Sequence, residues 1–251
     1  MNLVTSRDNP LLKELRRLSQ DGSAYRRAGR VWIEGDHLCR AALARGIVPD
    51  HAVFAESLWP SAPEAWRQAA PRQTVVSDRL FAEISALESP ARMGFVVTLP
   101  PAPAIAGGLD TVILDRLQDA GNVGSILRSA SAFGFRQVVA LKGSAALWSP
   151  KVLRAGMGAH FALHLVEGAE LTDLADLHVP FVTTSSHHGP FLHELVRQAA
   201  LPRPCAWILG HEGQGVREEL AALAGLAVRI AQPGGEESLN VAAAAALCLH
   251  A

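Results

Sequence analysis

The stretch TVILDRLQDAGNVGSILRSASAFGFRQVVAL, residues 111–141, places two apolar runs of strand length on either side of a helical segment. The runs TVILD and QVVAL are rich in β-branched residues, which favour strands. Between them, apolar residues recur at helical spacing after a polar loop that contains glycine. A strand, a helix and a second strand in this order predict a right-handed crossover between parallel strands.

The same alternation continues to the C-terminus, where the further apolar runs are FALHLV, FVTTS, AWILG and LAVRI. We therefore predict an α/β domain with a parallel sheet over residues 109–251. In the preceding part, residues 1–99, we predict a basic helical segment over residues 1–30 and a small α/β domain over residues 31–99, which mixes the runs RVWIEG, HAVFAE, TVVS and GFVVTL with helical pieces such as DHLCRAALARG. Proline and glycine in residues 100–108 indicate a linker between the two domains.

The composition is that of an ordinary globular protein, with 49% hydrophobic and 19% charged residues in a chain of 251. No apolar stretch reaches the ~18 residues that a membrane helix needs. The N-terminus lacks the apolar run of a signal peptide, so we expect a cytoplasmic protein. The cysteines are odd in number and far apart, which argues against a disulfide framework and a cysteine-based zinc site. They are Cys39, Cys205 and Cys248.

The net charge of −1 gives no global attraction to nucleic acid, but positive charge gathers near the N-terminus. The segment from Arg7 to Arg30 contains seven basic residues and three acidic ones. Such a patch can bind phosphates by releasing counterions, although a solvated face of an amphipathic helix explains the charges equally well. The candidate RNA contacts are Arg16, Arg17, Arg26 and Arg27.

Three polar loops follow predicted strands, at the edge of an α/β sheet where ligands bind. The first, after TVILD, lacks both the G-x-G-x-x-G pattern and the Gly-Lys-Ser/Thr of phosphate-binding loops. We predict that Asn122 caps the helix that follows it. Arg128 then lies on a polar stripe of that helix, where a plain surface role is the alternative.

The second and third loops carry further polar candidates. In HEGQG, residues 211–215, Glu212 stands between glycines and could orient a hydroxyl or amino group. In AQPGGEESLN, residues 231–240, Ser238 is predicted to cap the last helix. A fourth polar segment, SSHHGPFLHEL, contains His187, His188 and His193, but no nearby Glu or Cys completes a familiar metal-ligand spacing, so we expect a polar loop and no metal.

Taken in order, LQDAGNVGSILRSASAFGF, ILGHEGQGV and IAQPGGEESLNVAAAAALCLH resemble the three motifs of the SpoU (TrmH-like) RNA 2′-O-ribose methyltransferases, which belong to the SPOUT class. The resemblance covers residues 109–251, and KVLRAGMGAHFAL resembles a fourth segment between the first two motifs. The N-terminal SRDNPLLKELRRL and VWIEGDHLCRAAL resemble the family's RNA substrate-binding domain.

The resemblance implies a C-terminal SPOUT domain with a deep trefoil knot that binds S-adenosylmethionine without a metal. The family forms homodimers through this domain. The residues that the resemblance assigns to the cofactor pocket are Thr183, Thr184, Leu209, Gly210, Gly213, Ile230, Gln232 and Leu239.

The resemblance also assigns the chemistry, which is attack of a ribose 2′-hydroxyl on a sulfonium methyl group. Arg128 is the residue that activates the hydroxyl, and either this arginine or an RNA phosphate takes the proton. The residues that would hold Arg128 and the ribose are Asn122, Glu212, Ser238 and Asn240. We expect 23S ribosomal RNA as the substrate. The alternatives are a transfer-RNA or antibiotic-resistance methyltransferase, and a non-catalytic RNA-binding factor for ribosome assembly.

Overall fold

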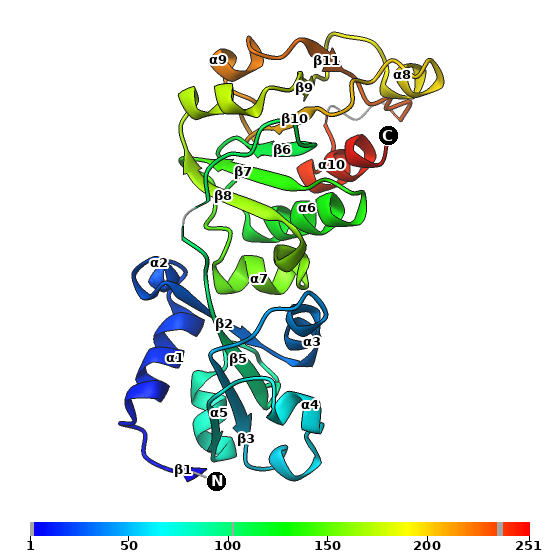
Figure 1. Ribbon diagram of the computed structural model, residues 1–251. Coiled ribbons are helices and arrows are strands. Elements are labelled where there is room, and N and C mark those ends of the chain that lie inside the picture. The colour runs from blue at the N-terminus through cyan, green and yellow to red at the C-terminus, as the bar shows by residue number, and fades with distance from the viewer. Residues whose placement is uncertain (1–2, 102, 235–237) are drawn as a thin grey trace. The chain divides into compact units, whose positions relative to one another are not determined.

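The computed structural model describes residues 3–101, 103–234 and 238–251 (Figure 1). The chain divides into two compact units. The first comprises Met1–Pro101 and Trp148–Phe161, and the second comprises Ala102–Leu147 and Ala162–Ala251. The segment 148–161 thus groups with the first unit although it follows the predicted linker in sequence, because its helix packs on elements of that unit.

A five-stranded mixed sheet forms the centre of the first unit, in the order β1-β4-β3-β5-β2. Strands β1, β3 and β4 are parallel, and β5 runs antiparallel to β2 and β3. The four apolar runs predicted here are all strands. The strands are β1 (Leu3–Val4), β2 (Arg30–Glu34), β3 (His51–Ala55), β4 (Gln73–Val76) and β5 (Met93–Thr98).

Helix α1 shows how the first unit is held together. Asn9 caps it by accepting a hydrogen bond from the Leu11 N–H, and Pro10 occupies the first turn, where its missing N–H costs nothing. Its apolar face is buried against residues of α5. The helices of this unit are α1 (Pro10–Gln20), α2 (Ala24–Ala28), α3 (Asp36–Ala44), α4 (Glu64–Arg67), α5 (Asp78–Ile84) and α7 (Pro150–Gly156), with the short 3₁₀ turn η1 (Trp59–Ser61) and all but the last residue of η2 (Ala159–Ala162).

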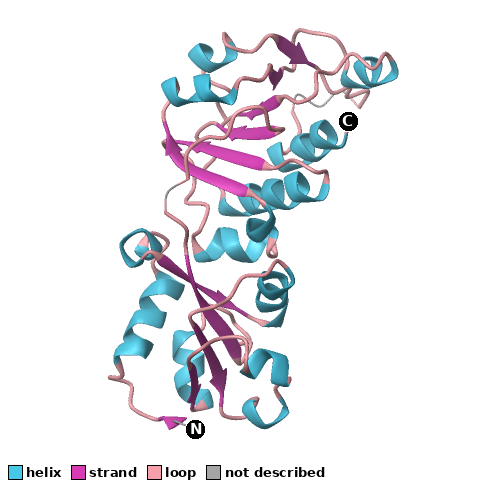
Figure 2. Ribbon diagram, viewed as in Figure 1, coloured by secondary structure: helices cyan, strands magenta, loops and turns pink. Residues whose placement is uncertain are grey.

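The second unit contains a six-stranded sheet in the order β11-β9-β10-β6-β7-β8, and every strand pair in it is parallel (Figure 2). The predicted parallel sheet is therefore confirmed. The strands are β6 (Thr111–Leu114), β7 (Gln137–Leu141), β8 (His164–Ala169), β9 (Phe181–Thr184), β10 (Ala206–Leu209) and β11 (Leu226–Val228).

Apolar residues are buried on both faces of this sheet. On one face, Ile113 and Ile208 pack with Leu174 and Leu220 from the short helices η3 and α9. Helix α10 packs along α6 and against β10. The helices of this unit are α6 (Ala120–Ala132), η3 (Thr172–Leu177), α8 (Leu192–Arg197), α9 (Glu218–Ala221) and α10 (Val241–His250).

Because all six strands are parallel, the loops that follow them emerge at one edge of the sheet. The loops after β6, β9, β10 and β11 carry the polar residues that the sequence singles out. The predicted trefoil knot stays a prediction. Among the described helices, none combines the length and apolar character required to cross a membrane.

Candidate active site

The first loop ends in a helix cap that differs from the predicted one. Helix α6 begins at Ala120, and the carboxylate of Asp119 accepts the Asn122 N–H at 2.7 Å. The prediction that Asn122 caps the helix is wrong, because Asp119 is an equally good capping residue and starts the helix earlier. Since its side chain is not used as a cap, the Asn122 amide can bond elsewhere.

Three predicted catalytic residues from three different loops form one hydrogen-bonded cluster. Asn122 Nδ2 donates to Glu212 Oε1 at 3.2 Å, and Asn240 Nδ2 donates to Asn122 Oδ1 at 3.0 Å. The backbone N–H of Asp119 also donates to Glu212 Oε1, at 3.3 Å. We call Glu212, Asn122 and Asn240 the loop-junction cluster. It joins the loops after β6, β10 and β11.

The two outer residues of the loop-junction cluster, Asn240 and Glu212, determine which atom donates in each hydrogen bond. Asn240 Oδ1 accepts the N–H groups of Ala242 and Ala243 at the start of α10, so its amide nitrogen must face Asn122. At the other end a carboxylate only accepts hydrogen bonds, so the amide nitrogen of Asn122 must face Glu212. Each amide nitrogen carries a second N–H, and within residues 3–101, 103–234 and 238–251 no acceptor takes it, so the cluster has donors for a ligand.

The same contacts correct the predicted cap of the last helix. Asn240 is the N-cap of α10, and Ser238 lies outside the helix. The cap prediction for Ser238 is therefore wrong, because the helix begins two residues later at a residue that caps equally well. Ser238 is exposed and lines the adjoining cavity.

Glu212 is held in its ionised form. Its partial burial alone would raise its pKa, but hydrogen bonds from Asn122 and from backbone N–H groups, including that of Asp119, hold the pKa below the usual value. A carboxylate that stays charged at neutral pH acts as an acceptor and not as a general acid.

A cavity of about 660 Å³ lies beside the cluster, within the second unit. This is in the usual range for small-molecule sites, about 300–1,000 Å³. Thr183, also predicted to bind the cofactor, is buried in β9 and is not among the lining residues. The predicted residues that do line the cavity are Thr184, Leu209, Gly210, Glu212, Gly213, Ile230, Gln232, Ser238, Leu239 and Asn240.

One polar atom of a cavity-lining residue, Gln232 Oε1, is buried without a partner among the described residues. A buried polar group without a hydrogen bond is costly. The cavity wall therefore offers hydrogen-bonding capacity that a polar ligand would satisfy.

The loop after β10 owes its shape to a close approach of its own backbone. A Cβ atom on Gly210 would lie 2.2 Å from the carbonyl carbon of Gly215 and from the nitrogen of Val216, so only glycine fits. His211 and Gly215 exchange two backbone hydrogen bonds of 3.0 and 2.8 Å. The result is a closed loop that presents Glu212.

Arg128 stands apart from the loop-junction cluster. It lies on α6 with an exposed side chain, and it is not among the residues that line the cavity. The part of the chain that the structure describes gives Arg128 no hydrogen bond or ion pair. Its predicted role therefore stays a prediction.

In the basic segment of the first unit, the structure separates the four predicted arginines. Arg16 is largely buried and bonds Glu83 at 3.1 Å, so it supports the fold. The other three have exposed side chains, and we call them the exposed arginines. They are Arg17, Arg26 and Arg27.

The histidine-rich segment forms a loop and the start of α8. Ser185 Oγ and His188 Nδ1 lie 3.0 Å apart, and the ring of His193 stacks on Phe191. Among the described residues, no group of three His, Cys, Asp or Glu side chains is placed to hold a metal ion. His187 lines the cavity. Its place in the loop after β9 could have indicated this, because ligands bind at the loops that follow the carboxyl ends of parallel strands.

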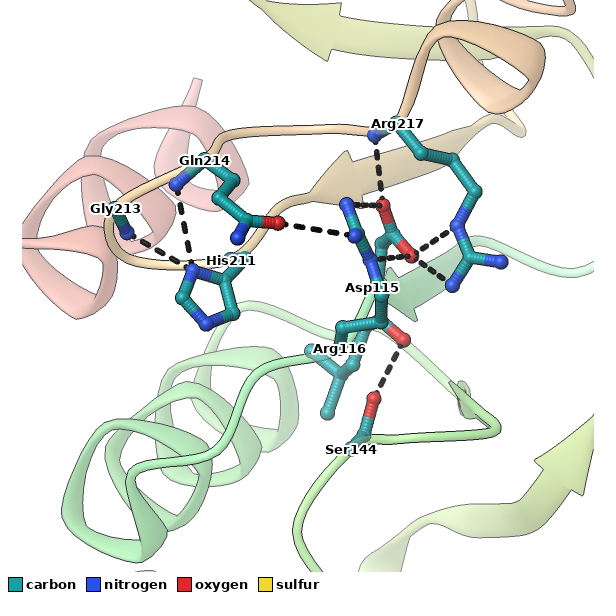
Figure 3. Close-up of polar contacts among 8 residues, drawn as sticks. Asp115, Arg116, Ser144, His211, Gly213, Gln214 and Arg217 are labelled. Carbon is teal, nitrogen blue, oxygen red and sulfur yellow. Dashed lines mark hydrogen bonds and ion pairs between the residues drawn. The ribbon is translucent and has the colours of Figure 1, made fainter.

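Sequence reasoning also missed Asp115 and Arg217, which join the first and second loops (Figure 3). Asp115 follows β6 directly and is fully buried. Burial alone would raise the pKa of Asp115, but hydrogen bonds from Arg217 and Arg116 hold it below the usual value. No signal in one sequence pairs two residues so far apart in the chain.

Comparison with known proteins agrees with this geometry. Residues 110–250 match the model of the SpoU rRNA Methylase family, and residues 9–93 match the MRM3-like substrate binding domain. An uncharacterized tRNA/rRNA methyltransferase of Synechocystis sp. is 33% identical over 98% of this chain and 92% of its own. The 23S rRNA (guanosine(2553)-2′-O)-methyltransferase RlmP of Bacillus subtilis is 29% identical over 100% of this chain and 98% of its own.

A solved structure extends the likeness to the fold of the whole chain. The AdoMet-bound rRNA methyltransferase from Sinorhizobium meliloti superposes with a TM-score of 0.82 at 26% identity, covering 99% of this chain and 95% of that one. The resemblance seen in the three motifs is confirmed. The chain belongs to the SpoU rRNA methylase family.

Proposed function

We propose that this protein transfers a methyl group from S-adenosylmethionine to a ribose 2′-hydroxyl of ribosomal RNA. The observation that carries the proposal is the cavity beside the loop-junction cluster, because three loops far apart in sequence meet there and Gln232 Oε1 in the cavity wall has no partner among the described residues. Family membership and the names of the full-length relatives support the same reaction.

The cavity suits S-adenosylmethionine in size and in chemistry. Leu209 and Ile230 supply apolar surface for a heterocycle, while Gln232 Oε1 is free to accept a hydrogen bond from an amino group. Bound there, S-adenosylmethionine supplies an electrophilic methyl group on a sulfonium sulfur. We expect binding to require no metal.

The residues of the chain then have two tasks, which are to align the 2′-hydroxyl and to let its proton leave. We assign alignment to the free N–H groups of the loop-junction cluster and to Ser238 beside it. The 2′-oxygen forms a bond to the methyl carbon while the carbon–sulfur bond breaks. The 2′-hydroxyl proton passes to an RNA phosphate.

We give Arg128 the role of a donor that holds this phosphate beside the hydroxyl. A guanidinium presents several N–H groups in a planar fork that matches phosphate oxygens. The exposed position of Arg128 on α6 leaves its guanidinium accessible to RNA. We assign the exposed arginines of the first unit to contacts with the RNA backbone.

We further propose a homodimer formed through α6 and α10 of the second unit, in the cytoplasm. Leu247 on α10 is 49% exposed and Phe133 at the end of α6 is 37% exposed, although both are large apolar residues. The ring of Phe133 packs against His250, so the two helices present one apolar surface. Light scattering should show a dimer for the wild type and a monomer for Leu247→Glu.

Titration calorimetry of S-adenosylmethionine into the full chain tests the cofactor assignment. We expect saturable binding that survives a metal chelator, and weaker binding for Gln232→Leu, which removes the unsatisfied acceptor. Gln198→Leu is the matched control, because Gln198 is an exposed residue at the end of α8 and does not line the cavity. Absence of binding to the wild type would reject the assignment.

A further inference from the structure

The buried carboxylate of Asp115 lies outside the cavity wall but contacts the Glu212 loop directly at Arg217 (Figure 3). We define the Glu212 loop as residues 210–217. At its far end, Asp115 Oδ2 accepts the backbone N–H of Arg217 at 2.9 Å, and Asp115 Oδ1 accepts Arg217 Nε at 2.7 Å and Nη2 at 2.5 Å. One carboxylate thus fixes both the main chain and the side chain of Arg217.

A second connection runs through Arg116. Its guanidinium lies 3.3 Å from Asp115 Oδ1, and its Nη1 donates to Gln214 Oε1 at 3.2 Å, in the middle of the Glu212 loop. Arg116 has a backbone φ of 58°, in the left-handed region that favours glycine. Strain of this kind persists only where surrounding contacts hold it, and here the contacts are those to Asp115 and Gln214.

Inside these two attachments the Glu212 loop is itself closed. Besides the backbone bonds between His211 and Gly215, His211 Nδ1 accepts the N–H groups of Gly213 at 3.0 Å and Gln214 at 3.3 Å (Figure 3). These bonds tie residues 211–215 to one another. Besides the contacts of Glu212 with Asn122 and Asp119, two links hold this loop to the first loop: Asp115 bonds Arg217 directly, and Arg116, which contacts Asp115, bonds Gln214.

We propose that Asp115 is a positioning residue that holds the Glu212 loop against the first loop and so sets cofactor affinity and the reach of Glu212 to Asn122. For its effect on the reaction this inference rests on the proposed function. For the order of the loop it rests on the contacts alone. Removing the charge of Asp115 would leave the guanidinium groups of Arg116 and Arg217 without their counterion. Because both groups are largely withdrawn from water, this would lower the stability of the loop contacts strongly.

A matched control stands at the other end of the same strand. Asp110 precedes β6, and it too accepts a backbone N–H, from Cys205 at 2.9 Å, and pairs with an arginine, Arg203, at 3.3 Å. The two carboxylates are separated by five residues of extended chain, about 16 Å. Asp110→Asn should therefore destabilise the fold without touching the Glu212 loop.

Hydrogen exchange of the ligand-free full chain is the first measurement. Asp115→Asn should speed exchange over residues 210–217, and Asp110→Asn should leave these residues as in the wild type. Calorimetry with S-adenosylmethionine is the second. Asp115→Asn should bind about tenfold more weakly or worse, the equivalent of one charged hydrogen bond, and Asp110→Asn within about twofold of the wild type.

The inference would be overturned if Asp115→Asn left both the exchange of residues 210–217 and the cofactor affinity unchanged. It would also be overturned if Asp115→Asn and Asp110→Asn lost exchange protection and affinity to the same extent. If Asp115→Asn does not fold, Arg217→Gln takes its place, because it removes two of the bonds and leaves the buried carboxylate its backbone partner. If the wild type fails to bind S-adenosylmethionine, the proposed function fails. Exchange over residues 210–217 still decides the inference in that case.

Discussion

Replacing Gly210 by alanine should open the Glu212 loop and weaken cofactor binding. The added Cβ atom would lie 2.2 Å from two backbone atoms, whereas ordinary contacts begin at 3.4 Å, so the loop would have to move by about 1 Å. Backbone atoms cannot rotate out of the way. The His211–Gly215 hydrogen bonds, at 3.0 and 2.8 Å, would lengthen past useful range.

The size of the effect follows from these contacts. Overpacking of this kind costs about 1–3 kcal/mol. If the loss falls on the conformation that binds the cofactor, affinity drops about 10- to 100-fold, since each 1.4 kcal/mol is tenfold. Calorimetry with S-adenosylmethionine measures this directly. Gly225→Ala is the control, because a Cβ there meets nothing within 4 Å. Equal affinity for both variants would refute the account of the loop.

Four further predictions use the same protein. Arg128→Ala and Arg128→Lys should each slow single-turnover methyl transfer at least ~100-fold with cofactor affinity unchanged; a loss of only a few-fold would make Arg128 a surface residue. Replacing the exposed arginines together should weaken RNA binding and flatten its salt dependence, and an unchanged slope would make them a solvated face. Because the folded pKa of Asp115 is lowered, its stabilisation is present above the ordinary aspartate value of about 3.9 and disappears as the pH falls through the lowered pKa. Urea unfolding should therefore show Asp115→Asn less stable than the wild type at neutral pH and the gap closing in acid; a gap that persists would contradict this. Burial raises the pKa of Cys205 to about 11 and of Cys248 to about 12, so alkylation followed by mass spectrometry should label them only after unfolding, and rapid labelling of the native protein would show that these thiols are accessible.

The sheet of the second unit could be predicted from the sequence because buried parallel strands are nearly continuous apolar runs. Each of its six runs is a strand. The helix starts were predicted less well. Asp119 and Asn122 both cap well, as do Ser238 and Asn240, and local sequence cannot choose between two good caps a few residues apart. The structure chooses Asp119 and Asn240, which leaves Asn122 for the loop-junction cluster.

Contacts between distant residues account for what the sequence could not indicate. The pairing of Asp115 with Arg217 joins loops that follow different strands, and the spacing of apolar residues in the sequence does not indicate which distant side chains will pair. Arg16 resembles its neighbours in sequence, yet Glu83 on α5 pairs with it and leaves it largely buried. Helix α7 follows the predicted linker in sequence but packs on α1 and β2. These tertiary contacts place it in the first unit.

The most direct test of the central claim is to identify the methylated atom. The purified full chain is incubated with methyl-labelled S-adenosylmethionine and unmodified ribosomal RNA, which is then digested to nucleosides and analysed by mass spectrometry. We predict label in a 2′-O-methylated nucleoside, and at least ~100-fold slower appearance of that label with Arg128→Ala. Label on a base, or RNA that is bound but never methylated, would contradict this prediction.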